Sequence, residues 1–415
     1  MKQKNKLILF PILIALATSC GQNSQFYDKV DLDFGAVTNV TPYTVRDTKT
    51  INDTSYYKMH GRYYTDTNLG VNFFNFSSAG FEVTFVGTTL EACLYTTNAD
   101  SNSSRPYIAV CIDNDYDPEH ATPIQLTNGK HSNCTGKNGQ YFIHDHVVLA
   151  HDLENKEHTV RVYKRSEANY SKVGVKSFAT DGTLLPVKAK EFDLKMEFYG
   201  DSVTCGYAVE SPDFYENFST RTENSMKTYA NYAANALNAD VSHISNGGYP
   251  MYKSEYSEGC SPDNIPELVD YASCDWNTLT KYTWDNSKYI PDVVVIALGA
   301  NDGSILSTFD PASKDFSDFV DMYKTKYLAF IQKLFTLYPN TLIVVSDEIL
   351  PLGEVFDNAM DEVVVAINNP RVIRAKYNAY NEAKDRMLPG AGHPNKEMQQ
   401  LAGLELANII RNALK

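Results

Sequence analysis

The spacing of apolar residues changes near residue 190, and this change constrains the fold more than any other feature of the chain. Before it, alternating runs such as 81–86 and 159–163 are separated by clusters of Asn, Asp, Gly and Ser, with no helical pattern between them. After it, apolar runs alternate with amphipathic stretches of helical period. Since 415 residues also exceed the usual size of one core, we expect two domains that meet within 187–191.

Residues 25–190 are predicted to form an all-β accessory domain. Further short runs of β-forming residues cover 107–112 and 147–150, and turn-forming residues separate such runs, as at 98–104. Many short strands at this spacing are typical of a β-sandwich or jelly roll.

Residues 191–415 are predicted to form an α/β domain with a mostly parallel sheet. Apolar runs that are flanked by helices on both sides are typical of strands buried on both faces of a sheet. We expect strands at 194–198, 293–298 and 341–345, and helices at 223–237, 316–337 and 397–414.

The first 19 residues have the pattern of an export signal. Three lysines precede an apolar run at 7–16, which is too short to span a bilayer comfortably. The residues that end at Cys20 resemble a bacterial lipobox, although Ala17 stands where leucine is usual. We therefore expect residues 1–19 to be a lipoprotein signal peptide and Cys20 to be lipidated. Gly21 and Gln22, directly after Cys20, are not the aspartate that would retain a lipoprotein in an inner membrane, and this favours the outer membrane. The lipid anchor is then the only expected membrane contact, and the side of the membrane that the protein faces is left open.

Composition narrows the ligands and the compartment. The formal net charge of −14 disfavours nucleic acid and anionic lipid surfaces as partners. Six cysteines follow Cys20, and export permits disulfides. Cys260 and Cys274 would close a short loop, but spacing alone leaves the pairing open. Cys205 is interpreted as a small buried residue rather than a catalytic thiol.

A serine follows the first predicted strand of the α/β domain. The chain reads Gly200-Asp201-Ser202 after 194–198 and then enters a helical pattern. Parallel sheets present ligands at the carboxyl ends of their strands, where helix N-termini offer backbone N–H groups. Ser202 is therefore the predicted nucleophile, and its own N–H is a predicted oxyanion donor. Glycine at 200 lets the chain turn without a Cβ clash.

Three later segments supply the other groups that acyl transfer needs. Gly247 and Gly248 offer backbone N–H groups that a ligand can approach closely. Asn301 follows the strand at 293–298, where its amide can donate to a developing oxyanion. His393 precedes the last helix, and imidazole titrates near working pH, so His393 is the predicted general base.

A metal site is the weaker interpretation of a second histidine pattern. His144 and His146 are two residues apart, a spacing that can bind metal. No third ligand is evident in the sequence, so we interpret them as surface or rim histidines. The predicted chemistry requires neither a metal nor an organic cofactor.

The order Gly-Asp-Ser, Gly, Gly-x-Asn-Asp and His-Pro resembles the SGNH (GDSL-like) hydrolase superfamily, over nearly all of 191–415. The segments 60–62, 81–88 and 158–168 look like the jelly-roll domain of carbohydrate esterase family two. That family couples such a domain to an SGNH domain and removes acetyl groups from xylan, glucomannan and related polysaccharides. The resemblance implies a serine esterase whose partner is an acetylated polysaccharide or oligosaccharide.

The sequence departs from the family pattern next to the predicted base. Most SGNH enzymes have an aspartate three residues before the histidine, where this chain has Gly390. Family two members often have Asp-Trp directly before the histidine, where this chain has Ala391 and Gly392. We therefore expect a Ser-His dyad with its imidazole held by main chain. Asp385 would substitute only if the loop folded back.

Two other functions use the same sequence features. A lipase or thioesterase would need an exposed apolar groove near the nucleophile, and the tyrosine-rich loops argue mildly against one. A non-catalytic glycan-binding lipoprotein would bind sugar and release no acetate. Aromatic residues near the catalytic segments are candidates for stacking on a sugar, with none singled out: Tyr207, Tyr249, Tyr252, Trp276 and Trp284.

Overall fold

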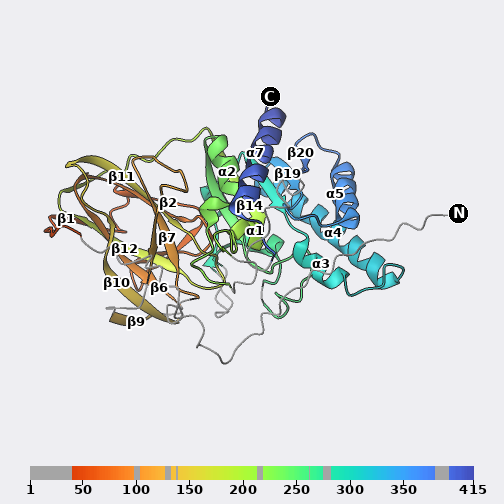
Figure 1. Ribbon diagram of the computed structural model, residues 1–415, viewed down its shortest axis with the longest axis horizontal. Coiled ribbons are helices and arrows are strands. Elements are labelled where there is room, and N and C mark those ends of the chain that lie inside the picture. Colours follow the sequence, from red (N-terminus) through yellow and green to blue (C-terminus); the bar gives the residue numbers. More distant parts are fainter. Residues whose placement is uncertain are drawn as a thin grey trace.

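The computed structural model describes residues 40–97, 103–126, 132–136, 139–212, 218–260, 262–273, 282–378 and 392–415. They form a β-rich domain, drawn in red to yellow in Figure 1, beside an α/β domain drawn in green to blue. Within these ranges no helix has the length and apolar character needed to cross a membrane. Several residues of the sequence analysis lie outside the described residues: the signal peptide with Cys20, and Cys274, Trp276, Asp385, Gly390 and Ala391.

The β-domain, from 47 to 185, consists of two antiparallel sheets packed face to face. The first contains, in spatial order, β3 (Tyr63–Asp66), β4 (Val71–Phe74), β12 (Val173–Thr180), β6 (Leu90–Thr96), β10 (Gly139–Ala150) and β9 (Ser132–Gly136), with β1 (Asp47–Thr50) also on β12. The second contains β13 (Thr183–Leu185), β5 (Gly80–Gly87), β11 (Lys156–Lys164), β7 (Tyr107–Ile112) and β8 (Thr122–Gln125), with β2 (Tyr57–His60) on β5.

Apolar side chains at every second position of the strands form the core between these two sheets. Phe81, Val83 and Phe85 of β5 are fully buried there, together with Val160 and Val162 of β11. The period of two in the sequence therefore places one face of each strand in the core. The predicted all-β sandwich of jelly-roll type is confirmed.

The α/β domain, from 194 to 413, is built on a parallel sheet. Its strands, in spatial order, are β15 (Ala239–Ser245), β14 (Leu194–Gly200), β18 (Val293–Ala297), β19 (Leu342–Ser346) and β20 (Val372–Ala375). Its helices are α1 (Ser202–Cys205), α2 (Tyr229–Ala236), α3 (Ala300–Leu306), α4 (Lys314–Leu337), α5 (Glu354–Ile367) and α7 (Lys396–Ala413). Smaller elements are the 3-10 helices η1 (Ser225–Lys227), η2 (Ile265–Asp270) and η3 (Asn286–Lys288), and the hairpin of β16 (Tyr271–Ser273) and β17 (Tyr282–Thr283).

The central strands are apolar on both faces because helices cover both. On β18, Val293 and Val295 pack in the core formed with α2 and α7, whereas Val294 and Ile296 pack in the core formed with α4 and α5. This arrangement confirms the predicted parallel sheet. The helix predicted over 223–237 is shorter than expected, because Thr228 has an extended backbone (φ −101°, ψ 158°) that separates η1 from α2.

Buried charged residues join the two domains. Arg62 of the β-domain is fully buried and donates to Glu197 of β14 at 3.0 Å. A second buried arginine, Arg161 on β11, donates to Asp240 at the start of β15 at 2.6 Å. Removing one partner of a buried ion pair leaves the other charge buried and uncompensated. The two domains are therefore held in one relative position by these pairs.

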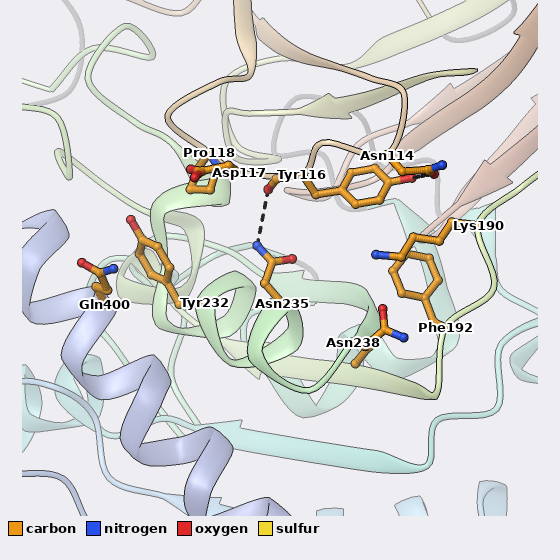
Figure 2. Close-up of a pocket in the computed structure, with 11 residues that line it drawn as sticks. Asn114, Tyr116, Asp117, Pro118, Lys190, Phe192, Tyr232, Asn235, Asn238 and Gln400 are labelled. Carbon is orange, nitrogen blue, oxygen red and sulfur yellow. Dashed lines mark hydrogen bonds between the residues drawn. The ribbon is translucent and has the colours of Figure 1, made fainter. Parts of the chain in front are cut away.

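A cavity of about 400 Å³ lies on the seam between the domains (Figure 2). Asn114 and Tyr116 from the loop after β7 line one side of it, and Tyr232 and Asn235 of α2 line another. None of the predicted catalytic residues is among its lining residues.

Candidate active site

The structure brings together Ser202 and His393, which are 191 residues apart in the sequence. Ser202 is the first residue of α1, directly after β14, and His393 lies just before α7. The distance from Ser202 Oγ to His393 Nε2 is 2.8 Å, within reach for proton transfer. Ser202 is 9% exposed as a whole residue, so little of it is open to solvent.

The turn that presents Ser202 leaves no room for a side chain at its start. A Cβ added to Gly200 would lie 2.0 Å from Thr204 Oγ1, so only glycine fits. Asp201 is buried and caps α1, because its Oδ1 accepts the Val203 N–H at 3.0 Å. Burial, with a contribution from the charge of Asp302, raises the pKa of Asp201 to about 7.

The Asn301 amide lies beside this turn and is already engaged. Its Nδ2 donates to Asp201 Oδ2 at 2.9 Å and to the Tyr249 carbonyl at 3.1 Å. An amide nitrogen carries two protons, so the predicted oxyanion contact requires Asn301 to exchange one of these bonds. The neighbouring Asp302 is fully buried, and its carboxylate accepts the backbone N–H groups of Met251, Tyr252 and Lys253.

The structure distinguishes between the two glycines proposed as oxyanion donors. The Gly247 N–H donates to the carboxylate of Glu167, a residue of the β-domain, so it is not available to a ligand. Gly248 has a φ of +80°, and a Cβ there would lie 2.8 Å from Tyr256 Cβ. Its N–H has no hydrogen-bond partner within the part of the chain that the structure describes. Of the pair, Gly248 is thus the available donor.

A row of stacked rings begins at the imidazole. The ring of Tyr207 stacks on that of His393, with centroids 4.2 Å apart and planes 30° apart. Phe218 stacks on Tyr207 at 4.6 Å, and Tyr170 from the β-domain stacks on Phe218 at 4.2 Å. The sequence pattern made Tyr207 a sugar-stacking candidate, whereas the structure places its ring against His393.

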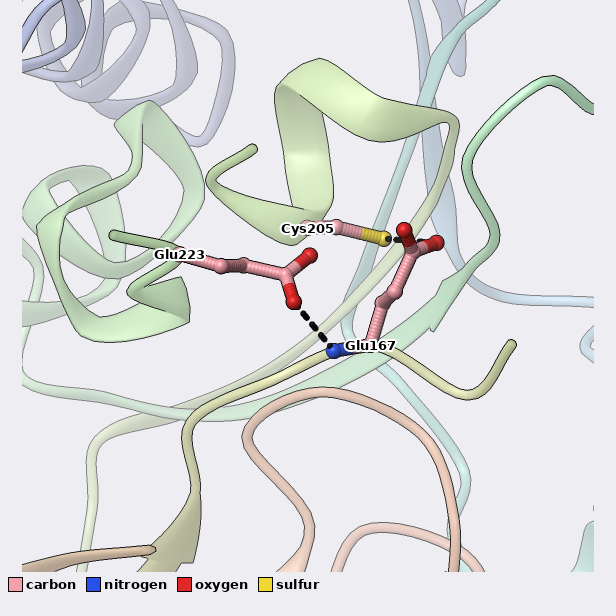
Figure 3. A group of neighbouring side chains, drawn as sticks. All are labelled: Glu167, Cys205 and Glu223. Carbon is pink, nitrogen blue, oxygen red and sulfur yellow. Dashed lines mark hydrogen bonds between the residues drawn. The ribbon is translucent and has the colours of Figure 1, made fainter. Parts of the chain in front are cut away.

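A buried cluster of Glu167, Glu223 and Cys205 includes the last residue of α1, the helix that begins at Ser202 (Figure 3). One oxygen or sulfur atom of each lies within 4.8 Å of the others. Burial raises the pKa of Glu167 to about 7, and burial together with the charge of Glu167 raises the pKa of Glu223 well above its usual range. Burial also raises the pKa of the Cys205 thiol, so this cysteine stays protonated, in line with its predicted structural role.

Sequence reasoning did not identify Glu167 or Asn169 as site residues. Glu167 lies inside the segment 158–168 that carried the family resemblance, but nothing in its spacing indicates a contact with Gly247. That contact depends on how the two domains pack. The same holds for Tyr170 and Phe218, which are far apart in the sequence and meet only in the ring stack.

Several of the other candidates are buried. His144 and His146 do not share a face, because β10 has a register irregularity after His144; the first is buried against Thr96 and the second is exposed. Tyr249 and Trp284 are 1% and 7% exposed. Cys260 carries a free thiol in this structure.

Two family models and several known proteins are similar to this chain. Residues 196–406 match the family model described as GDSL-like lipase/acylhydrolase, and residues 59–187 match the one described as carbohydrate esterase 2 N-terminal. A cellulase/esterase, CelE, of Acetivibrio thermocellus is 33% identical over 181 residues, which cover 43% of this chain and 20% of that protein. An acetylxylan esterase/glucomannan deacetylase of Cellvibrio japonicus is 24% identical over 339 residues, which cover 81% of this chain and 84% of the relative.

A solved structure supports the same fold. A family two carbohydrate esterase from Clostridium thermocellum, in complex with cellohexaose, aligns with a TM-score of 0.69 and 23% identity, over 86% of this chain and 99% of that one. At this identity the likeness concerns the fold. The first family model, however, spans just over half of the 415 residues. The chain therefore belongs to the GDSL-like lipase/acylhydrolase family, and the carbohydrate esterase 2 N-terminal domain precedes its catalytic domain.

Proposed function

We propose that the protein is a serine esterase that removes O-acetyl groups from a polysaccharide such as xylan or glucomannan. The observation that carries this proposal is the 2.8 Å contact between Ser202 Oγ and His393 Nε2 at the carboxyl end of a parallel sheet. The substrate class is supported by the name of the Cellvibrio japonicus relative and by the cellohexaose bound to the Clostridium thermocellum enzyme.

The reaction proceeds in two halves through a Ser-His dyad. Ser202 Oγ attacks the acetyl carbonyl while His393 Nε2 accepts its proton. The tetrahedral intermediate collapses, and the sugar oxygen leaves with the proton that His393 returns. A water molecule then attacks the acyl-enzyme, with His393 as base, and acetate and free Ser202 are released.

Backbone donors at the nucleophile and at the glycine pair stabilise the oxyanion in this proposal. Ser202 N–H and Gly248 N–H are two of them, and the Asn301 amide joins as a third when it exchanges its bond to the Tyr249 carbonyl. Losing one such donor costs about 10²- to 10³-fold in kcat. Gly247 supports this hole through its fixed position rather than by donating.

Main chain orients the His393 imidazole in the proposed dyad. Gly390 stands where most SGNH enzymes have the orienting aspartate, and it lies outside the described residues. The stack on Tyr207 supports this arrangement from the side, since it restrains the plane of the ring.

The pattern of residues 1–20 supports a second proposal, that the protein is an exported lipoprotein of the cell envelope. A substitution of Cys20 tests it. In a bacterial host, a Cys20→Ser variant is expected to lose incorporation of labelled palmitate and partition into the aqueous phase of a detergent extraction. Equal labelling of both proteins would exclude lipidation at this cysteine.

Acetate release tests the esterase directly. The wild-type protein, Ser202→Ala and a control, Ser307→Ala at the exposed C-cap of α3, are compared on acetylated xylan, acetylated glucomannan and an aryl acetate. Ser202→Ala is expected to lose roughly 10⁴-fold or more in kcat, and Ser307→Ala to match wild type. Sugar binding without acetate release by the wild type would favour a glycan-binding protein. A preference for long-chain esters would favour a lipase or thioesterase.

A further inference from the structure

The carboxylate of Glu167 crosses from the β-domain to the glycine turn of the catalytic domain. Glu167 follows β11, and its Oε2 accepts the Gly247 N–H. Two residues later, the Asn169 amide donates to the Gly247 carbonyl at 3.0 Å. Both backbone polar groups of Gly247 are therefore held by side chains of the other domain.

The contact is also tight in shape. A Cβ added to Gly247 would lie 2.8 Å from both carboxylate oxygens of Glu167, so the carboxylate packs directly on the glycine. Any side chain at 247 would displace Glu167. Gly247 is therefore required at this position by the approach of another residue, rather than by its own backbone conformation.

The same carboxyl group contacts the helix that carries the nucleophile. The Cys205 thiol, on α1, lies 3.7 Å from Glu167 Oε2 and 3.3 Å from Ser245 Oγ at the end of β15. Glu223 of the α/β domain accepts the Glu167 N–H at 2.9 Å. Glu167 thus connects the glycine turn to α1 at the two places where the proposed oxyanion donors arise.

Glu167 is held in place by a buried cation. Lys164 is fully buried, and its Nζ donates to the carbonyls of Ser166 and Glu167 at 2.6 and 2.8 Å. These bonds restrain the backbone that carries the carboxylate. Buried charged groups of this kind are retained only when they are hydrogen-bonded.

We propose that Glu167 is a positioning residue of the active site: it fixes Gly247 so that the N–H of the next residue, Gly248, stays directed at the oxyanion. This proposal rests on the proposed esterase activity. It makes the β-domain a working part of the catalytic centre. An interface that only joined the two domains would not require a carboxylate on the oxyanion turn.

Kinetics with an aryl acetate test the role. Glu167→Ala removes the acceptor, Glu167→Gln keeps the volume but weakens the bond by removing the charge, and Asn169→Ala removes the second hold on Gly247. We expect kcat to fall about 10- to 100-fold in Glu167→Ala and less in Glu167→Gln, with KM within about twofold, because a small misplacement costs transition-state stabilisation. The control is Glu210→Gln, which alters an interdomain carboxylate paired with Arg165 and Lys227 and should leave kcat unchanged.

The pH profile separates positioning from packing. The ionised carboxylate accepts the Gly247 N–H, so protonation near pH 7 should weaken the hold and steepen the acid side of the kcat profile. In Glu167→Gln this ionisation is absent, and the acid side should become shallower. The charged and titratable groups around the Glu167 and Glu223 pair are Lys164, Arg165, Tyr170, Asp201, Cys205 and Tyr207.

A measurement that needs no activity completes the test. Amide hydrogen exchange over 245–249 should be faster in Glu167→Ala and Asn169→Ala than in wild type or Glu210→Gln. If Glu167→Ala does not fold, Glu167→Gln takes its place. Unchanged exchange, or unchanged kcat in both Glu167 variants, overturns the proposal. If wild type hydrolyses no ester, the proposed function fails, while the exchange data still decide whether Glu167 holds the turn.

Discussion

The His393 imidazole is contacted at one ring nitrogen and on one face. Nε2 meets Ser202 Oγ, and the face of the ring meets Tyr207. Stacked aromatic pairs contribute about 0.5–1.5 kcal/mol beyond the area they bury. That is enough to bias the plane of a ring whose loop lacks the usual aspartate.

The Tyr207 stack predicts different outcomes for two substitutions. Tyr207→Phe keeps the ring and should retain kcat/KM for an aryl acetate within about twofold, whereas Tyr207→Ala should lose about 10-fold, since the imidazole gains freedom to rotate. Steady-state kinetics of both variants give the answer. Equal losses would mean that the hydroxyl, rather than the ring, matters.

Buried carboxyl groups predict how stability depends on pH. The pKa values of Asp201 and Glu167 are raised by burial to about 7 in the folded protein, whereas in the unfolded chain they titrate near about 4. Between these values the folded state holds protons that the unfolded state releases, so the free energy of unfolding should fall as pH rises from about 5 to 7.

Urea unfolding at pH 5, 6, 7 and 8 measures this slope. In Glu167→Gln one titrating group is removed, so the decline should be shallower than in wild type. A free energy of unfolding that increases from pH 5 to 7 would contradict the expected direction.

At the scale of elements, the sequence predicted what depends on local pattern. The strands β14, β18 and β19 were predicted because their apolar residues face cores on both sides. The proximity of Ser202 and His393 follows from their places at the carboxyl edge of the sheet and before the last helix. The helix over 223–237 was predicted too long, because its pattern does not reveal the extended Thr228.

The parts that were not predicted depend on how separate elements pack. The Gly247 N–H is hydrogen-bonded to Glu167 because the loop after β11 packs on the glycine turn. The different exposure of His144 and His146 follows from a register irregularity within β10. Neither leaves a periodic trace in the sequence. The role of Gly248 was predicted together with that of Gly247, and only the hydrogen bonds distinguish them.

The glycine turn predicts a contrast between two positive-φ positions. Gly248 and Gly259 have φ values of +80° and +85°, so alanine at either should cost about 1–2 kcal/mol in stability. A Cβ meets Tyr256 at position 248, whereas position 259 has no atom within 4 Å. Gly248→Ala should therefore also lose esterase activity, and Gly259→Ala should keep it. Thermal unfolding and acetate release measure both effects; equal activity would argue against a catalytic turn at 248.

At the scale of the whole molecule, the buried ion pairs make the domains interdependent. Arg62 and Glu197 are both 0% exposed, so neither has water to replace its partner. Cooperative unfolding of both domains in one transition is the expected behaviour. The β-domain expressed alone would carry a bare arginine where it now meets β14.

Removing one member of this pair should be costly. Arg62→Met leaves Glu197 buried without its cation and should lower the free energy of unfolding by about 3–5 kcal/mol. Adding Glu197→Gln to the same protein should restore part of that loss, since the buried charge is gone. The exposed Arg46→Met is the control. Calorimetry of the four proteins tests this, and a double variant as unstable as the single one would argue against a charge effect.

The interface between the domains also restricts how recombination can exchange domains of such a protein during evolution. Arg62 with Glu197 and Arg161 with Asp240 place the two halves of each pair on opposite sides of the junction near residue 190. A recombination event at that junction would combine one member of each pair with a domain from another gene that was not selected to carry the matching charge. The accessory and catalytic halves are therefore expected to be inherited, and exchanged between ancestral genes, as one unit.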